Sequence, residues 1–90
     1  MKIIVMSQPG KEFSPEKIQQ HLAQELEQVR DLYLTGVIRE HYQRADGPGL
    51  VFVLECADLD EARAHIDQLV LVREQLIEPT YIPLSPLRTW

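Results

Sequence analysis

Leu50-Val51-Phe52-Val53-Leu54 is an unbroken run of five apolar residues, and the rest of the fold can be derived outward from it. The turn sequence Asp46-Gly47-Pro48-Gly49 precedes the run. The run is short and rich in β-branched and aromatic residues, which predicts a strand. A strand with one face in water would alternate apolar and polar residues. Because this run does not alternate, we expect both faces of its sheet to be covered.

Similar signals predict the other elements. Residues 3–6 are all apolar, so a strand formed by them would have two apolar faces, which predicts a second central strand. Ser14-Pro15-Glu16 predicts a helix start, because serine caps helices and proline suits the first helical position, and Gly36 ends that helix after about Leu34. The remaining expected elements are a polar strand over 37–43, a helix that opens at Asp58, a loop over 69–72 and a last strand over 76–84.

The order β-α-β-β-α-β predicts an α+β fold of the ferredoxin-like kind. The strand over 37–43 is polar, and the last strand contains Pro79 and Pro83, which cannot donate to a ladder; both strands are therefore expected at sheet edges. One sheet face would carry both helices. The other face is apolar but has no cover within the chain. We therefore expect two sheets to pack face to face in a homodimer, or a higher homo-oligomer, as a dimeric α/β barrel.

The composition limits the classes of function. The 90 residues predict one domain, and the net charge of −5 argues against nucleic acid as a partner. No stretch approaches the ~20 apolar residues of a membrane helix, and no signal peptide is visible. The single cysteine, Cys56, suits a reducing compartment, which predicts a cytoplasmic protein. The histidines and Cys56 lack metal-ligand spacing and there is no phosphate-binding loop, so neither a metal nor a cofactor is expected.

Glu25 is the first candidate for chemistry. Ile18, Leu22, Val29 and Tyr33 form an apolar arc on the predicted first helix, and Glu25 falls inside this arc. A carboxylate on a buried face is costly unless it is paired, and burial raises its pKa toward the range useful for proton transfer. The structural alternative is that Glu25 lies at the edge of the arc and reaches solvent or pairs with an arginine.

Polar residues of the predicted second strand could share a pocket with Glu25. By period-two alternation, Arg39 and His41 lie on one strand face and Tyr42 on the other. If Arg39 and His41 face the helices, they would bring a cation and an imidazole to Glu25. His21 stands one helical turn before Glu25 and could pair with it. The alternative is that this strand is polar because edge strands are wet.

Tyr42 and Trp90 are further candidates for ligand contact. Tyr42 is the aromatic residue next to His41. Trp90 ends an apolar tail over 84–90, which could close a pocket or dock on a partner subunit. Chain ends are also often disordered, and that reading stays open.

Several residues between positions 14 and 71 share a common spacing with a known family: Pro15, Lys17, Glu25, Leu32, Gly36, Arg39, Ala45, Gln68, Leu69 and Leu71. On these residues the chain resembles the muconolactone isomerase family of dimeric α+β barrels. The resemblance implies a cofactor-free isomerase with catalytic residues at Glu25 and Arg39. The chain departs from the family pattern at two pocket positions, where Leu22 replaces a lysine and Ile38 replaces a tryptophan.

These observations support competing functions. The first is a cofactor-free isomerase that acts on a small lactone or unsaturated acid, with Glu25 moving the proton and Arg39 holding a carboxylate. The second is a small-molecule-binding module without turnover. The third is a domain whose task is dimerisation. A monooxygenase of aromatic polyketides, another activity found on related barrels, is less favoured because only the tail is rich in aromatic residues.

Overall fold

The computed structural model describes residues 1–88. Within that range the elements are β1 (Lys2–Pro9), α1 (Pro15–Leu34), β2 (Ile38–Gln43), β3 (Leu50–Glu55), α2 (Leu59–Ile66), α3 (Val70–Arg73) and β4 (Ile77–Pro83). The predicted strands and the two longer helices are confirmed. The prediction of a loop over 69–72 was wrong, because α3 lies there. A helix of four residues is too short for its apolar residues to show a helical period.

The ends of α1 and α2 are fixed by residues that the sequence indicates. Ser14 Oγ accepts a hydrogen bond from the Lys17 N–H at 3.2 Å, which caps α1. Gly36 follows α1 with a φ of +86°, a left-handed conformation that glycine adopts at little cost. Asp58 caps α2 by accepting from the Glu61 N–H at 2.8 Å.

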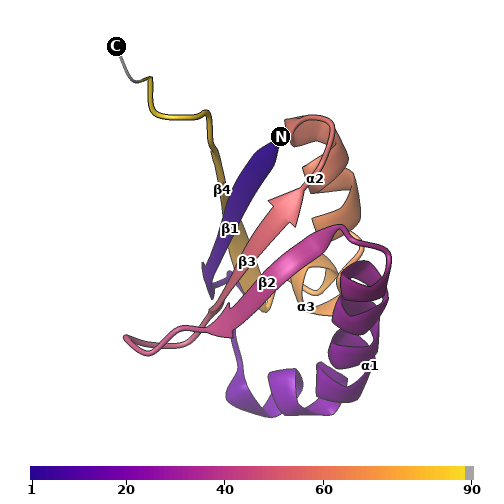
Figure 1. Ribbon diagram of the computed structural model, residues 1–90. Coiled ribbons are helices and arrows are strands. Elements are labelled where there is room, and N and C mark those ends of the chain that lie inside the picture. The colour runs from indigo at the N-terminus through magenta and orange to yellow at the C-terminus, as the bar shows by residue number, and fades with distance from the viewer. Residues whose placement is uncertain (89–90) are drawn as a thin grey trace.

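The four strands form one antiparallel sheet in the order β2-β3-β1-β4. Figure 1 shows the helices together on one side of this sheet. The architecture is α+β and compatible with the ferredoxin-like arrangement. β2 and β4 lie at the two edges, as expected, and β4 contains both Pro79 and Pro83.

The sheet face under the helices holds the core. Ile3, Val5, Phe52 and Leu54 are at most 4% exposed on this face. They pack in one cluster with Ile38 from β2 and with Ala62, Ile66 and Leu69 from the α2 region. Cys56 is also buried in this cluster.

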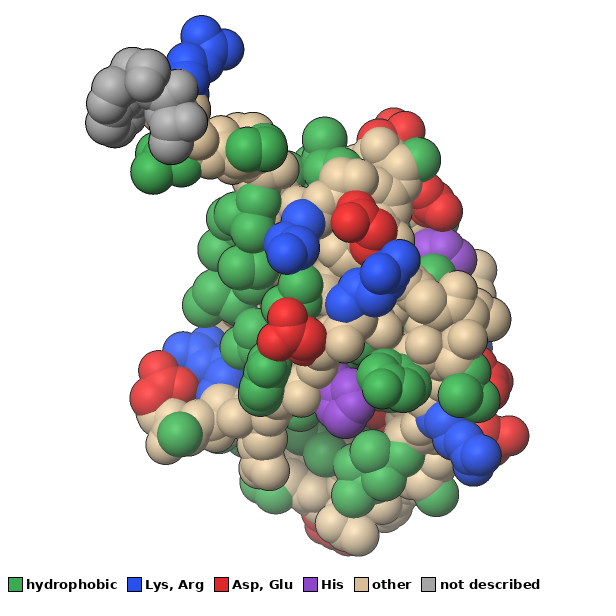
Figure 2. Space-filling model, in the orientation of Figure 1, with side chains coloured by type: hydrophobic (Ala, Val, Ile, Leu, Met, Phe, Trp, Pro, Cys, Tyr) green, Lys and Arg blue, Asp and Glu red, His purple; other side chains and the backbone are tan. Residues whose placement is uncertain are grey.

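The opposite face of the sheet, called the open face from here on, is apolar, and no helix within residues 1–88 lies over it. Register pairs place Ile4 beside Val53 and Ile82, and Met6 beside Val51, so these five side chains share the open face. Figure 2 shows hydrophobic side chains gathered along the side of the sheet that is turned away from the helices. No helix in the described part of the chain is long and apolar enough to cross a membrane.

Candidate functional site

A cavity of about 260 Å³ lies between α1, the β2–β3 hairpin and the start of α3. We call it the α1 cavity. Most of its lining is apolar, and its polar members come from α1 and β2. The lining residues are Leu22, Glu25, Leu26, Val29, His41, Tyr42, Gln43, Leu50, Phe52 and Leu71.

Glu25 is the buried polar residue of this cavity, with 2% of its surface exposed. Its Oε1 accepts a hydrogen bond from the backbone N–H of Leu71 at 3.1 Å. Its Oε2 is buried without a hydrogen-bond partner. Burial raises the pKa of the Glu25 carboxyl above its ordinary value, and the bond from Leu71 partly opposes this rise. The carboxyl group is therefore suited to exchanging a proton and has one oxygen free to bind a donor.

Glu25 also has a structural role, because it helps to hold α3. The residue before α3, Leu69, has no side chain that could cap the helix. Two residues of α1 supply the acceptors instead: Glu25 for the Leu71 N–H, and Gln28 Oε1 for the Val70 N–H at 2.8 Å. The sequence interpretation missed Gln28 and Leu71 because α3 was not predicted. The signal that could have found Gln28 is its position one turn after Glu25 on the same side of α1.

His41 lies on the helix side of the sheet. It is paired in register with Phe52, and both line the α1 cavity. Its ring meets the ring of Tyr33 edge-on, with centroids 5.5 Å apart. An imidazole and the Glu25 carboxyl thus share one cavity.

Tyr42 is paired with Val51, so the register places it on the open face. It nevertheless contributes to the lining of the α1 cavity. Its hydroxyl donates to Glu40 Oε1 at 2.5 Å, and this hydrogen bond raises the pKa of the phenol. The phenol is therefore engaged at the protein surface. Only part of Tyr42 faces the cavity.

Arg39 does not line the α1 cavity. A β-bulge explains its position: Ile38 pairs with Leu54 and Glu40 pairs with Val53, so Arg39 is the extra residue between them. Simple alternation, which would place Arg39 on the face of His41, therefore fails here. Its exposed side chain turns back and donates from Nε to the Gly36 carbonyl oxygen at 2.7 Å.

His21 is not brought to Glu25 by the described structure. His21 is half-buried on α1 and is not among the lining residues of the α1 cavity. Trp90 lies outside the described residues. Of the predicted site residues, the structure gathers Glu25, His41 and Tyr42.

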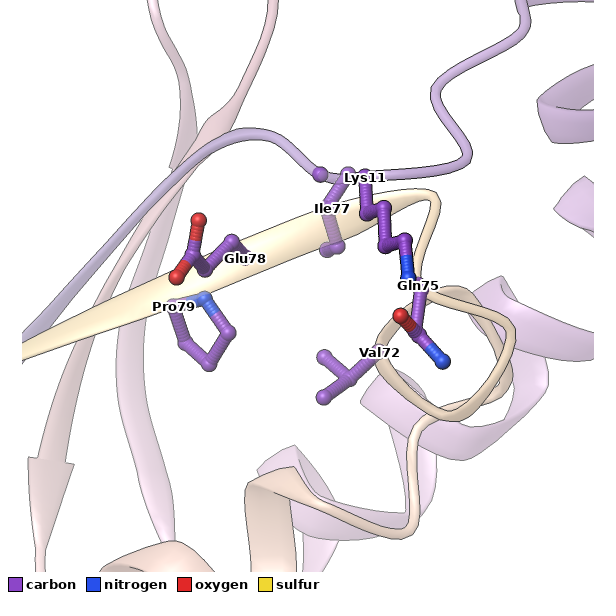
Figure 3. Close-up of a pocket in the computed structure, with 7 residues that line it drawn as sticks. Lys11, Val72, Gln75, Ile77, Glu78 and Pro79 are labelled. Atoms are coloured by element: carbon purple, nitrogen blue, oxygen red, sulfur yellow. The ribbon is translucent and has the colours of Figure 1, made fainter.

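A second cavity, of about 250 Å³, lies where the loop after β1 meets α3 and the start of β4. Figure 3 shows the side chains that line it, among them Lys11, Val72 and Glu78. Both charged groups, Lys11 and Glu78, are exposed, so this cavity contains no buried ionisable group. The α1 cavity is the better candidate site for that reason.

Comparison with known proteins adds no relative. No protein-family model matches the chain, and a search of curated proteins gives no match. The resemblance to muconolactone isomerases therefore remains a prediction from the residues given above. Among residues 1–88, no three side chains of the His, Cys, Asp and Glu types are grouped so that they could hold a metal ion.

Proposed function

We propose that this protein binds a small molecule in the α1 cavity, with Glu25 as the group that recognises it. One observation carries the proposal: Glu25 Oε2 is buried without a partner beside an apolar cavity. A buried polar atom without a hydrogen bond costs free energy, and a ligand that supplies the bond recovers that cost. Few convergent polar groups in a mainly apolar cavity are also the usual composition of a ligand site.

Proton transfer is the second candidate function, and it uses the same cavity. The raised pKa of Glu25 favours it, because a carboxyl with a pKa nearer neutrality both gives and takes a proton more readily at physiological pH. A cofactor-free isomerase of this kind would act on a neutral lactone, with the apolar lining excluding water. Arg39 has no place in this scheme, since it does not line the cavity.

A fragment panel tests the binding function. The ¹⁵N–¹H NMR spectrum of the protein is followed while small ring compounds, including neutral lactones, are added. We expect shifts of the amides around the cavity, with the Leu71 amide among the most affected because it bonds to Glu25. Turnover of any lactone, followed by proton NMR in deuterated water, separates the isomerase from the binding module. A panel in which no compound moves the Leu71 amide overturns the binding proposal.

We also propose that the protein is a homodimer in which two open faces pack together as a dimeric barrel, in the cytoplasm. The chain exposes 6208 Å², whereas a compact monomer of its mass exposes roughly 5,400 Å². The extended segment after β4, which is exposed over 84–88, contributes to this difference. The dimer is supported by the apolar open face, which no helix in residues 1–88 covers.

A charge on the open face tests the dimer. Val53 is central on this face, between Ile4 and Glu40, whereas Phe52 faces the helices. Val53→Lys would force an unpaired charge into the interface and should shift the mass in light scattering to the 10.4 kDa of one chain. Gln24→Lys, at an exposed position of α1, adds the same charge and should leave the dimer intact. A wild-type mass of one chain contradicts the dimer.

A further inference from the structure

We infer that the ligand of the α1 cavity is a small hydrophobic amine or alcohol, whose N–H or O–H donates to Glu25 Oε2, and that it is not an acid. The inference rests on the proposed binding function and narrows it to one chemical class. It departs from the sequence expectation of an unsaturated acid held by Arg39. The reason is the set of charges that the cavity does and does not contain.

Among the residues that the structure describes, no lysine or arginine lines the α1 cavity. A carboxylate ligand would therefore place a second negative charge beside Glu25 in apolar surroundings, where the imidazole of His41 is the one other lining group able to carry a charge of the opposite sign. The protein as a whole carries a net charge of −5, which also repels anions. A cationic amine meets the opposite situation, because Glu25 supplies its counter-charge.

The free hydrogen-bonding position of Glu25 is an acceptor. Leu71 N–H already occupies Oε1, and Oε2 has no partner. A ligand donor satisfies Oε2 when the carboxyl is ionised, and an alcohol can both give and take a hydrogen bond when the carboxyl is protonated. A ligand with only acceptor atoms leaves the ionised form unsatisfied. A donor is thus the one polar feature that the site requires in that form.

The apolar lining residues and the volume of the cavity limit the size and shape of the apolar part of the ligand. The cavity measures about 260 Å³. This is smaller than the roughly 300–1,000 Å³ of typical ligand sites, so it fits a molecule with a single ring. Phe52, Leu71 and Val29 offer apolar contact to that ring. Phe52 and Tyr42 also contribute to the lining, and aromatic rings attract cations.

Access to Oε2 requires a movement of the lining, because neighbouring atoms shield this oxygen from water. Leu26 lines the cavity and is 58% exposed, so its side chain has few contacts to lose on moving aside. The more buried lining, such as Phe52 at 4% exposure, is fixed by the core. We expect the ligand to enter past Leu26.

Four compounds with the same ring test the inference: benzylamine, benzyl alcohol, benzoate and toluene. Each is titrated into the native protein at pH 7, and the dissociation constant is read from NMR shifts of the cavity amides. Hydrogen bonds to charged groups contribute enough for benzylamine to bind roughly tenfold to a hundredfold more tightly than toluene. Benzyl alcohol should lie between these two, and benzoate should bind more weakly than toluene.

Glu25→Gln sharpens the test, since it keeps an acceptor for the Leu71 N–H and puts an amide donor in the place of Oε2. The preference for benzylamine should disappear and the rejection of benzoate should be reduced. Glu27→Gln is the matched control: it removes the same charge from an exposed position of α1 and should keep the wild-type order. An unchanged order in both variants would place the discrimination outside Glu25 and overturn the inference.

The outcomes separate the two proposals. If wild-type protein binds benzoate at least as tightly as benzyl alcohol, or toluene as tightly as benzylamine, the ligand class is wrong while the binding function stands. If none of the four compounds nor any lactone of the wider panel shifts the Leu71 amide, the binding function fails and the inference fails with it.

Discussion

The two faces of the sheet are built from the same strands but are covered very differently. Under the helices, Ile3 and Leu54 are fully buried, at 0% exposure. On the open face, their chain neighbours Ile4 and Val53 are half-buried, and Ile82 is 40% exposed. Chemically the two faces are alike near their centres. The difference arises because the helices lie on one side only.

This contrast shows what a strand sequence specifies and what it leaves open. The alternation of side chains along a strand identifies the buried face only if one face is apolar and the other polar. In the centres of β1 and β3 the residues on both faces are apolar. The connections through α1 and α2 decide which set enters the core of the subunit. The other set is left as an apolar surface, which is the usual mark of an interaction site.

The largest expected effect compares one truncation on each face. Leu54→Ala removes buried side-chain atoms from the core and should lower the free energy of unfolding by about 2–5 kcal/mol. Val53→Ala removes less from a half-buried site and should cost under about 1 kcal/mol within a single subunit. Urea denaturation followed by circular dichroism measures both.

Protein concentration is the control for this comparison. If two open faces pack together, the urea midpoint of the wild type rises with concentration, and Val53→Ala should weaken that dependence. Equal losses for the two variants at every concentration would mean that the faces are equally covered within one subunit. That result would contradict the one-sided architecture.

The sequence predicts most of the fold because its signals are local. The apolar run from Leu50, the caps Ser14 and Asp58, and the prolines of β4 each identify an element or an edge without knowledge of the rest. The short helix α3 escapes such signals. Its caps come from α1, more than 40 positions earlier in the chain.

The candidate site could be predicted only in part for the same reason. The helical period places Glu25 on the buried side of α1, and the structure agrees. The position of Arg39 depends on a β-bulge that shifts the register between Ile38 and Glu40, and no residue pattern here signals it. The partner of Glu25 is a backbone N–H of α3, which side-chain patterns cannot show.

A smaller effect compares two glutamines. On the helix side, Gln28 accepts from Val70 N–H at 2.8 Å and donates to the Gln68 carbonyl oxygen at 2.9 Å, which ties α1 to the start of α3. On the open face, the Gln8 side chain donates to the exposed Thr80 hydroxyl at 3.2 Å. Gln28→Ala should lower the free energy of unfolding by about 0.5–2 kcal/mol, as the loss of a helix cap does. Gln8→Ala should stay within about 0.5 kcal/mol of the wild type. Thermal unfolding measures both, and a greater loss for Gln8→Ala would show that the open face holds the subunit together.

The smallest effect concerns the buried carboxyl group on the helix side of the sheet and the response of stability to pH. Burial raises the pKa of Glu25 above the ordinary value of 4.5, while the Leu71 N–H limits the rise. Below a pH equal to that ordinary value, Glu25 is protonated in both the folded and the unfolded chain. The free energy of unfolding then has its full contribution from the protonated Glu25. This contribution is lost as the pH climbs through the raised pKa of the folded protein, because the unfolded chain ionises first.

Glu25→Gln removes this group, so the stability of the variant relative to the wild type should increase between pH 4 and pH 7. Gln8→Ala, on the open face, removes no ionisable group and should show no such change. Urea midpoints at a series of pH values, taken in the same buffer, measure the difference for each variant. The Leu71 N–H stabilises the ionised form of Glu25. We therefore expect this change of stability with pH to be smaller than the effects of the core truncation and of the Gln28 substitution. A Glu25→Gln curve that runs parallel to the wild type would show that Glu25 ionises as easily in the folded protein as in the unfolded chain, and Glu25 would then not be suited to proton transfer.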